Sequence, residues 1–157
     1  EQRMDQGRGL SRRQEIARRI ARAVEDGLPV AQTDRTDRLV FRHRVVRSDL
    51  PEHQPVAKPF YETDSVHPAE LHVLRFGEVA MATNPFELYH DYATRIEARS
   101  PATLTLLVQI CGGHSGYLPT QRAVQGGGYS ADRFLVGPVG GQVLVEETVR
   151  HLEELFR

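Results

Sequence analysis

The spacing of apolar residues near the start of the chain predicts an amphipathic helix over residues 11–27. Its apolar stripe consists of Ile16, Ala17, Ile20, Ala21 and Val24. Ser11 followed by Gln14 fits a capping box, in which each side chain satisfies a free backbone N–H of the first turn. Gly27 offers the left-handed residue that often ends a helix. Residues 1–10 are polar and have no period, so we expect a loose arm there.

Further along, alternating and continuous apolar runs predict strands. Residues 39–47 read as a strand, and residues 71–76 and 78–83 as two strands that meet in a hairpin at Gly77. Residues 103–110 read as a strand that is almost continuously apolar from Leu104 to Val108, as expected for a strand covered on both faces. On the first strand, one face should carry Val40, Arg42, Arg44 and Val46.

Two more helices are expected, one after Asn84-Pro85 and one after Pro138. Asn caps helices and Pro is favoured at the first helical position, while Ser100-Pro101 stops the first of the two. Their buried stripes should be Phe86, Tyr89, Ala93 and Ile96 in one, and Val145, Val149, Leu152 and Phe156 in the other. Strands that alternate with covering helices indicate an α/β fold with a mixed β-sheet covered by helices.

The length of 157 residues predicts a single domain over residues 1–157. Within it, residues 48–68 carry four prolines and predict a long loop that serves a function or packs on something else. The chain opens with Glu1 and not Met, which suggests trimming or processing, so we expect a piece of a larger protein.

Composition narrows the classes of function. The 20 basic and 21 acidic side chains give a net charge of −1, which argues against general nucleic-acid binding. The arginines of the first helix are interleaved with acidic residues, which favours a solvated face over a nucleic-acid patch. A single cysteine, Cys111, excludes an intramolecular disulfide and a Cys-rich zinc site. No apolar run reaches the roughly 18 residues of a transmembrane segment, and we identify no signal peptide.

Candidate chemistry gathers after two predicted strands, at residues 82–87 and 111–120, because ligands of open α/β sheets collect beyond strand ends. Taken locally, Glu87 completes a capping box with Asn84, and His90 shares a helix side with it as a possible metal partner. Ser115 nearly fits the nucleophile elbow G-x-S-x-G of serine hydrolases, but Tyr117 stands in place of the last glycine.

Three segments taken together resemble a known family. They are the run from Leu74 to Leu88 (LRFGEVAMATNPFEL), Gly116 to Thr120 (GYLPT) and Gly126 to Tyr129 (GGGY). The chain from about residue 71 to 156 resembles the later part of the catalytic domain of the neutral/alkaline non-lysosomal ceramidase family, and is closest to its bacterial branch. The resemblance implies a piece of a larger α/β sandwich domain and a zinc amidohydrolase that cleaves the N-acyl bond of ceramide or a related lipid amide.

The same resemblance implies roles for three residues. In the family, zinc is held by two histidines, one glutamate and one tyrosine, and Glu87 and Tyr117 match the glutamate and the tyrosine. A second family tyrosine lies twelve residues after the first, near the scissile amide, and Tyr129 matches it. A phenol there can donate a hydrogen bond to the developing oxyanion.

Two departures from the family pattern leave alternatives open. Cys111-Gly112 stands where characterised members have Ala-Asn, so substrate contacts near this loop should differ. The family's histidine ligands lie in its upstream half and match nothing here, so we expect them from an upstream segment or a second chain. On this expectation the chain alone is inactive. The alternative is a non-catalytic α/β module that keeps the scaffold and binds a partner or ligand.

Overall fold

The computed structural model describes residues 11–31, 39–51 and 68–157. The expected arm at 1–10 and residues 52–67 of the predicted Pro-rich loop lie outside the described residues. Contacts divide the chain into two compact units, Glu1–Asp37 and Arg38–Arg157, which we describe separately. A single domain over residues 1–157 stays a prediction.

The first unit contains helix α1 (Arg12–Gly27) and the short 3₁₀ helix η1 (Leu28–Val30). The predicted capping box is confirmed, since Ser11 and Gln14 each accept a hydrogen bond from the other's backbone N–H. The left-handed end at Gly27 is wrong: its φ of −77° is right-handed, and the chain continues directly into η1. Arg18 and Arg19 both form ion pairs with Glu15, in line with a charge-paired helix face.

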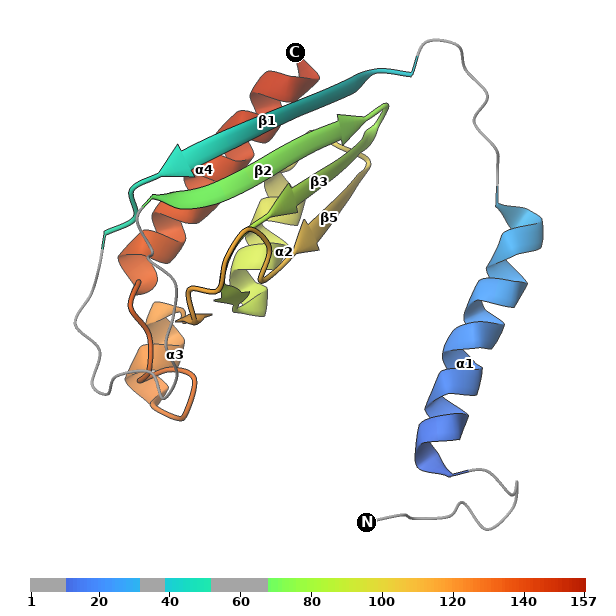
Figure 1. The fold of residues 1–157 in the computed structure, drawn as a ribbon, viewed down its shortest axis with the longest axis horizontal. Coiled ribbons are helices and arrows are strands. Elements are labelled where there is room, and N and C mark those ends of the chain that lie inside the picture. The colour runs from blue at the N-terminus through green and yellow to red at the C-terminus, as the bar shows by residue number, and fades with distance from the viewer. Residues whose placement is uncertain (1–10, 32–38, 52–67) are drawn as a thin grey trace. The chain divides into compact units, whose positions relative to one another are not determined.

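The second unit is built on a four-stranded sheet (Figure 1). Its strands are β1 (Phe41–Ser48), β2 (Ala69–Phe76), β3 (Val79–Thr83) and β5 (Leu104–Val108), in the order β1-β2-β3-β5. The first two pairings are antiparallel and β3 pairs with β5 in parallel, so the predicted mixed sheet is confirmed. The hairpin at Gly77 is also confirmed, and a φ of +57° explains why glycine suits that turn.

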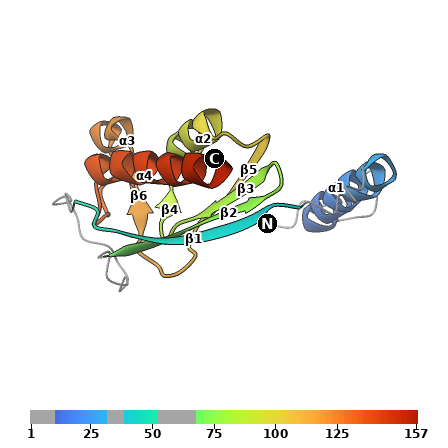
Figure 2. The same cartoon turned by 90° about the horizontal axis from the view of Figure 1, so that it is seen from above.

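Helices α2 (His90–Arg99), α3 (Gln121–Gly126) and α4 (Pro138–Phe156) all lie on one side of this sheet (Figure 2). The core forms between them, where α4 packs against β2, β1 and α2. Its fully buried members include Leu71, Val73, Ala80, Ile96, Leu144, Val145, Val149 and Leu152. No helix among the described residues is long and apolar enough to cross a membrane.

Two arginines of the sheet anchor the end of α4. Arg42 and Arg75 are register partners on β1 and β2, and both donate to the carbonyl oxygen of Leu155, at 3.0 and 3.1 Å. The last carbonyls of a helix have no partner within the helix, so these bonds satisfy a group that would otherwise need water. They confirm that Arg42 belongs to the face of β1 that the sequence analysis assigned to it.

The opposite face of the sheet differs from the prediction. Leu104, Leu106 and Val108 of β5 are 53%, 43% and 37% exposed, so the expectation of a strand covered on both faces is wrong within the described residues. Phe41 and Phe76 pack against each other on the same open face, with ring centroids 5.1 Å apart. The almost continuous apolar run therefore belongs to a strand that buries one face and leaves the other, also apolar, face exposed to solvent.

Candidate functional site

The segment after β3 forms part of a second, two-stranded sheet and not the predicted helix start. Strand β4 (Glu87–Leu88) pairs in parallel with β6 (Tyr117–Leu118), and α2 begins only at His90, after Tyr89. The helix predicted to start at Asn84-Pro85 and the capping-box role of Glu87 are therefore wrong. Asn84 uses its side chain differently, because its Oδ1 accepts from the backbone N–H of Phe86 at 3.0 Å.

Hydrogen bonds to a distant stretch of chain explain this outcome. The backbone N–H of Asn84 donates to Val108, and that of Glu87 donates to Gly116, at 3.0 and 2.9 Å. Leu88 donates to the side-chain Oε1 of Gln109 at 2.7 Å. A helix would have to satisfy the same groups within itself, so these contacts replace its first turn. Gly116, with a φ of +72°, supplies the left-handed turn that leads the chain into β6.

This pairing brings two of the sequence-predicted site residues together. Glu87 and Tyr117 are direct register partners on the two paired strands. Partial desolvation raises the pKa of the Tyr117 phenol, and the hydrogen bond to Glu87 with its negative charge raises it further. Without a cation, the phenol therefore stays protonated and serves as a donor to the carboxylate.

Tyr129, which follows α3 in the chain, joins this cluster. Its ring meets the Tyr117 ring edge-on, with centroids 5.9 Å apart and an interplanar angle of 75°. Tyr129 as a whole is 56% exposed. All three residues named from the sequence thus lie in one place, although their chemical roles stay predictions.

A fourth residue, His114, was not assigned any role from the sequence. Its Nε2 lies 3.6 Å from Glu87 Oε1, and the two side chains are 37% and 30% exposed. A search for histidines at helical metal-ligand spacing misses His114, because its neighbour Glu87 lies on another strand. The sequence does give one indication of His114: it lies in the glycine-rich loop, three residues before Tyr117.

His90 and Ser115 do not join the cluster in the way the sequence suggested. His90 opens α2 while Glu87 lies on β4, so the proposed shared helix side is wrong. The His90 ring lies 3.4 Å from the hydroxyl of Thr94, one turn further along α2. Ser115 is only 1% exposed, which places its hydroxyl out of reach of a substrate and removes the basis of the serine-nucleophile interpretation.

The donor set of the cluster suits zinc. A carboxylate, a phenol and an imidazole supply oxygen and nitrogen ligands of the kinds that zinc accepts. Within the described stretches of chain, no group of three His, Cys, Asp or Glu side chains could hold a metal ion. Glu87 and His114 are two such side chains that lie close together, and Tyr117 is the register partner of Glu87.

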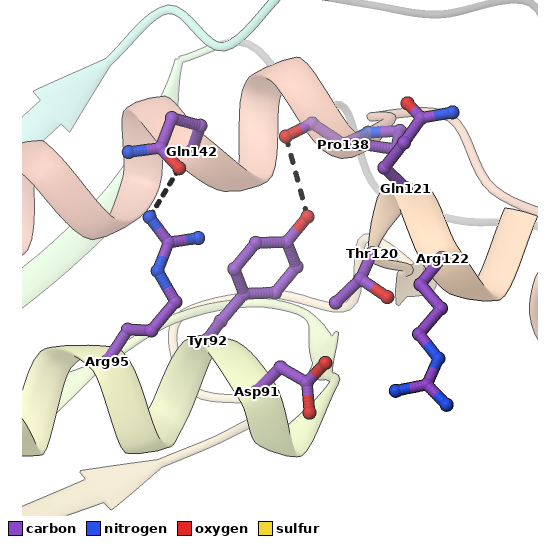
Figure 3. A pocket seen from close by; sticks show the side chains of 8 residues that line it. All are labelled: Asp91, Tyr92, Arg95, Thr120, Gln121, Arg122, Pro138 and Gln142. Atoms are coloured by element: carbon purple, nitrogen blue, oxygen red, sulfur yellow. Dashed lines mark hydrogen bonds between the residues drawn. The ribbon is translucent and has the colours of Figure 1, made fainter.

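A separate hollow of about 260 Å³ lies between α2, the start of α3 and α4 (Figure 3). Tyr92 projects into it and donates to the carbonyl of Pro138 at 3.4 Å, while Arg95 reaches Gln142. None of Glu87, Tyr117 and Tyr129 lines it. The hollow is therefore distinct from the cluster.

Comparison with known proteins gives a limited result. No family model matches the chain, and no curated protein matches it. Among solved structures, the chain is similar to a neutral ceramidase from Pseudomonas aeruginosa and to a ceramidase complexed with C2. Each match has 17% sequence identity and a TM-score of 0.46, and covers 54% of this chain but 15% of the ceramidase chain. Similarity at this level says nothing of the substrate or metal of this chain.

Proposed function

We propose that this chain is part of a ceramidase-like, zinc-dependent amidohydrolase that cleaves the N-acyl amide of ceramide or a related lipid amide. One observation supports the proposal most. Glu87 and Tyr117, which match the family's glutamate and tyrosine ligands, lie 30 residues apart in sequence and meet as register partners. The Glu87 carboxylate also contributes to the raised pKa of the Tyr117 phenol, which supports the approach of these two oxygen donors to one another.

In this proposal each residue of the cluster has a separate task. Glu87 and Tyr117 hold the zinc through a carboxylate oxygen and a phenol oxygen. When bound, zinc lowers the pKa of a coordinated water towards 7 and polarises the amide carbonyl. Tyr117 would hold zinc best as phenolate, so its phenol would lose its proton on zinc binding. Tyr129 donates a hydrogen bond to the oxygen that gains negative charge as the amide is attacked.

The remaining ligands complete the site from outside the two strands. By resemblance they are histidines of an upstream segment of the same catalytic domain, or of a second chain. Two oxygen ligands alone leave zinc under-coordinated, since catalytic zinc sites keep three protein ligands and one open position. The open apolar face of the four-stranded sheet offers a surface on which further parts of a larger domain can pack.

The test is hydrolysis of an N-acylsphingosine by the chain joined to its upstream segment. We expect release of fatty acid that a chelator abolishes and added zinc restores. Glu87→Gln should lose both zinc and activity, whereas Glu97→Gln, a matched change on the exposed side of α2, should lose neither. If the joined protein binds no zinc and releases no fatty acid, the proposal is wrong, and the non-catalytic α/β module becomes the better interpretation.

A further inference from the structure

Tyr89 connects the chain segments of two site tyrosines, one through its backbone and one through its side chain. Its backbone N–H donates to the carbonyl oxygen of Leu118, the residue after Tyr117, at 3.4 Å. Its hydroxyl lies 2.7 Å from the hydroxyl of Ser130, the residue after Tyr129, which is an ordinary length for a hydrogen bond between two hydroxyl groups. Tyr89 therefore bonds to a chain neighbour of each of the two tyrosines.

Tyr89 is itself held in place on several sides. It is the N-cap residue of α2, and its carbonyl oxygen accepts from the backbone N–H of Tyr92 at 3.1 Å. Its side chain is partly buried and packs against the hydrophobic core. Since its backbone bonds to both β6 and α2, Tyr89 is a fixed point for the group that bonds to its hydroxyl.

The loop that carries Tyr129 is open at its glycines. Three glycines at 126–128 precede Tyr129, and a Cβ added at any of them would meet no atom within 4 Å. The last two have φ angles of +71° and +121°, which glycine adopts without steric cost. The backbone N–H of Ala131 donates to the carbonyl oxygen of Gly128 at 3.0 Å, and this bond closes a turn within the loop itself. The hydrogen bond from Ser130 to Tyr89, in contrast, ties the loop to α2.

We infer that Tyr89 is a positioning residue, which holds Tyr129 edge-on against Tyr117 through its hydrogen bond to Ser130. The inference rests on the proposed function, in which Tyr129 donates to the oxyanion, and names the residue that sets where this donor lies. An oxyanion donor is effective only at hydrogen-bond distance from the position that the charged oxygen will occupy. The ring centroids of Tyr117 and Tyr129 are 5.9 Å apart, and loss of the tie to Tyr89 should change that separation.

Steady-state kinetics of the chain joined to its upstream segment test the inference. Tyr89→Phe and Ser130→Ala should each lower kcat about 10–100-fold with KM and zinc content nearly unchanged, because a small misplacement of a reacting group costs about this much. Ser130→Thr keeps the hydroxyl and should keep kcat. The matched control is Ser100→Ala at the other end of α2, which removes a hydroxyl that bonds to Thr105 and should leave kcat unchanged. When Tyr129→Phe is already present, Tyr89→Phe should cause no further fall, because the donor that it positions is absent.

Fluorine NMR of the 157-residue chain, labelled with 3-fluorotyrosine, follows Tyr129 without catalysis or zinc. The resonance of Tyr129 is identified by its loss in Tyr129→Phe. Tyr89→Phe and Ser130→Ala should shift or broaden this resonance, because the ring loses its fixed place beside Tyr117. Ser130→Thr and Ser100→Ala should leave it unchanged. Thermal melting by circular dichroism shows whether each variant remains folded.

The outcomes separate this inference from the proposed function. If the Tyr129 resonance is the same in Tyr89→Phe and Ser130→Ala as in the unchanged chain, the inference is wrong. It is also wrong if Tyr89→Phe lowers kcat by the same factor with and without the Tyr129 hydroxyl, since Tyr89 then acts only on the fold. A joined protein that releases no fatty acid contradicts the proposed function, and the fluorine spectra then decide by themselves whether Tyr89 holds Tyr129.

Discussion

Gly141→Ala should destabilise the second unit, because α4 crosses the ring of Tyr92 at this glycine. A Cβ added at Gly141 would lie 2.3 Å from both Cζ and the hydroxyl oxygen of Tyr92, closer than real Cβ atoms come to any neighbour. The ring has no room to move aside, since Tyr92 is 2% exposed and its hydroxyl donates to the carbonyl of Pro119 at 3.0 Å. Helix and ring must therefore separate by roughly 1 Å, which is overpacking of a well-filled core.

The expected cost follows from three contributions. Overpacking costs about 1–3 kcal/mol, and loss of the hydrogen bond from Tyr92 to Pro119 costs about 1 kcal/mol. Alanine recovers up to about 1 kcal/mol of helix propensity. The net loss of about 1–3 kcal/mol in the free energy of unfolding should lower Tm by about 4 °C per kcal/mol for a unit of this size.

Thermal melting followed by circular dichroism, with urea unfolding alongside, measures this loss. The matched control is Gly126→Ala at the end of α3, where an added Cβ meets no atom within 4 Å. It should leave stability unchanged or raise it slightly. If Gly141→Ala melts at the same temperature as the unchanged chain, the packing of α4 on Tyr92 described here is wrong.

Three further predictions concern protonation and catalysis. Burial raises the pKa of Tyr92 to about 12, whereas in the unfolded chain the phenol ionises near 10. The free energy of unfolding should therefore be constant up to about pH 10 and fall by at most about 2–3 kcal/mol between pH 10 and 12. Urea unfolding measured across this pH range should show a smaller fall for Tyr92→Phe. The 157-residue chain alone should not hydrolyse ceramide with added zinc, because two oxygen ligands leave zinc under-coordinated. Turnover that a chelator abolishes would contradict this. In the chain joined to its upstream segment, Tyr129→Phe should lower kcat by about 10²–10³-fold, because it removes a hydrogen-bond donor to the oxyanion. KM and zinc content should stay nearly unchanged. An unchanged kcat would mean that Tyr129 only packs on Tyr117.

Short sequence patterns predicted the elements whose beginnings and ends depend only on residues close by in the chain. The capping box of Ser11 and Gln14 closes within one turn, and the hairpin at Gly77 depends on one left-handed residue between two apolar runs. The end of α2 at Ser100-Pro101 is equally local, since the residue before a proline avoids helical geometry. Such features need no information from the rest of the chain.

Asn84-Pro85 shows where local signals stop being sufficient. An Asn side chain that accepts a backbone N–H two or three residues later fits a turn as well as a helix cap. The choice between them is made by backbone bonds to residues near 108 and 116, which no local pattern contains. The exposed leucines of β5 are a similar case, because an apolar run does not say whether a second layer lies on the strand.

The candidate site was predictable in part. Glu87, Tyr117 and Tyr129 were named through a resemblance, and neither spacing nor periodicity identifies them. Their proximity follows from the pairing of β4 with β6, two strands of two residues each that are too short to be recognised in a sequence. His114 was missed for the same reason, since its relation to Glu87 exists only after these strands pair.

The most direct test of the central claim is the position of zinc in crystals of the chain joined to its upstream segment, located from anomalous diffraction at the zinc edge. We expect a zinc ion within about 2.2 Å of both a Glu87 carboxylate oxygen and the Tyr117 phenol oxygen. A zinc ion bound elsewhere, or one more than about 3 Å from either oxygen, would contradict it.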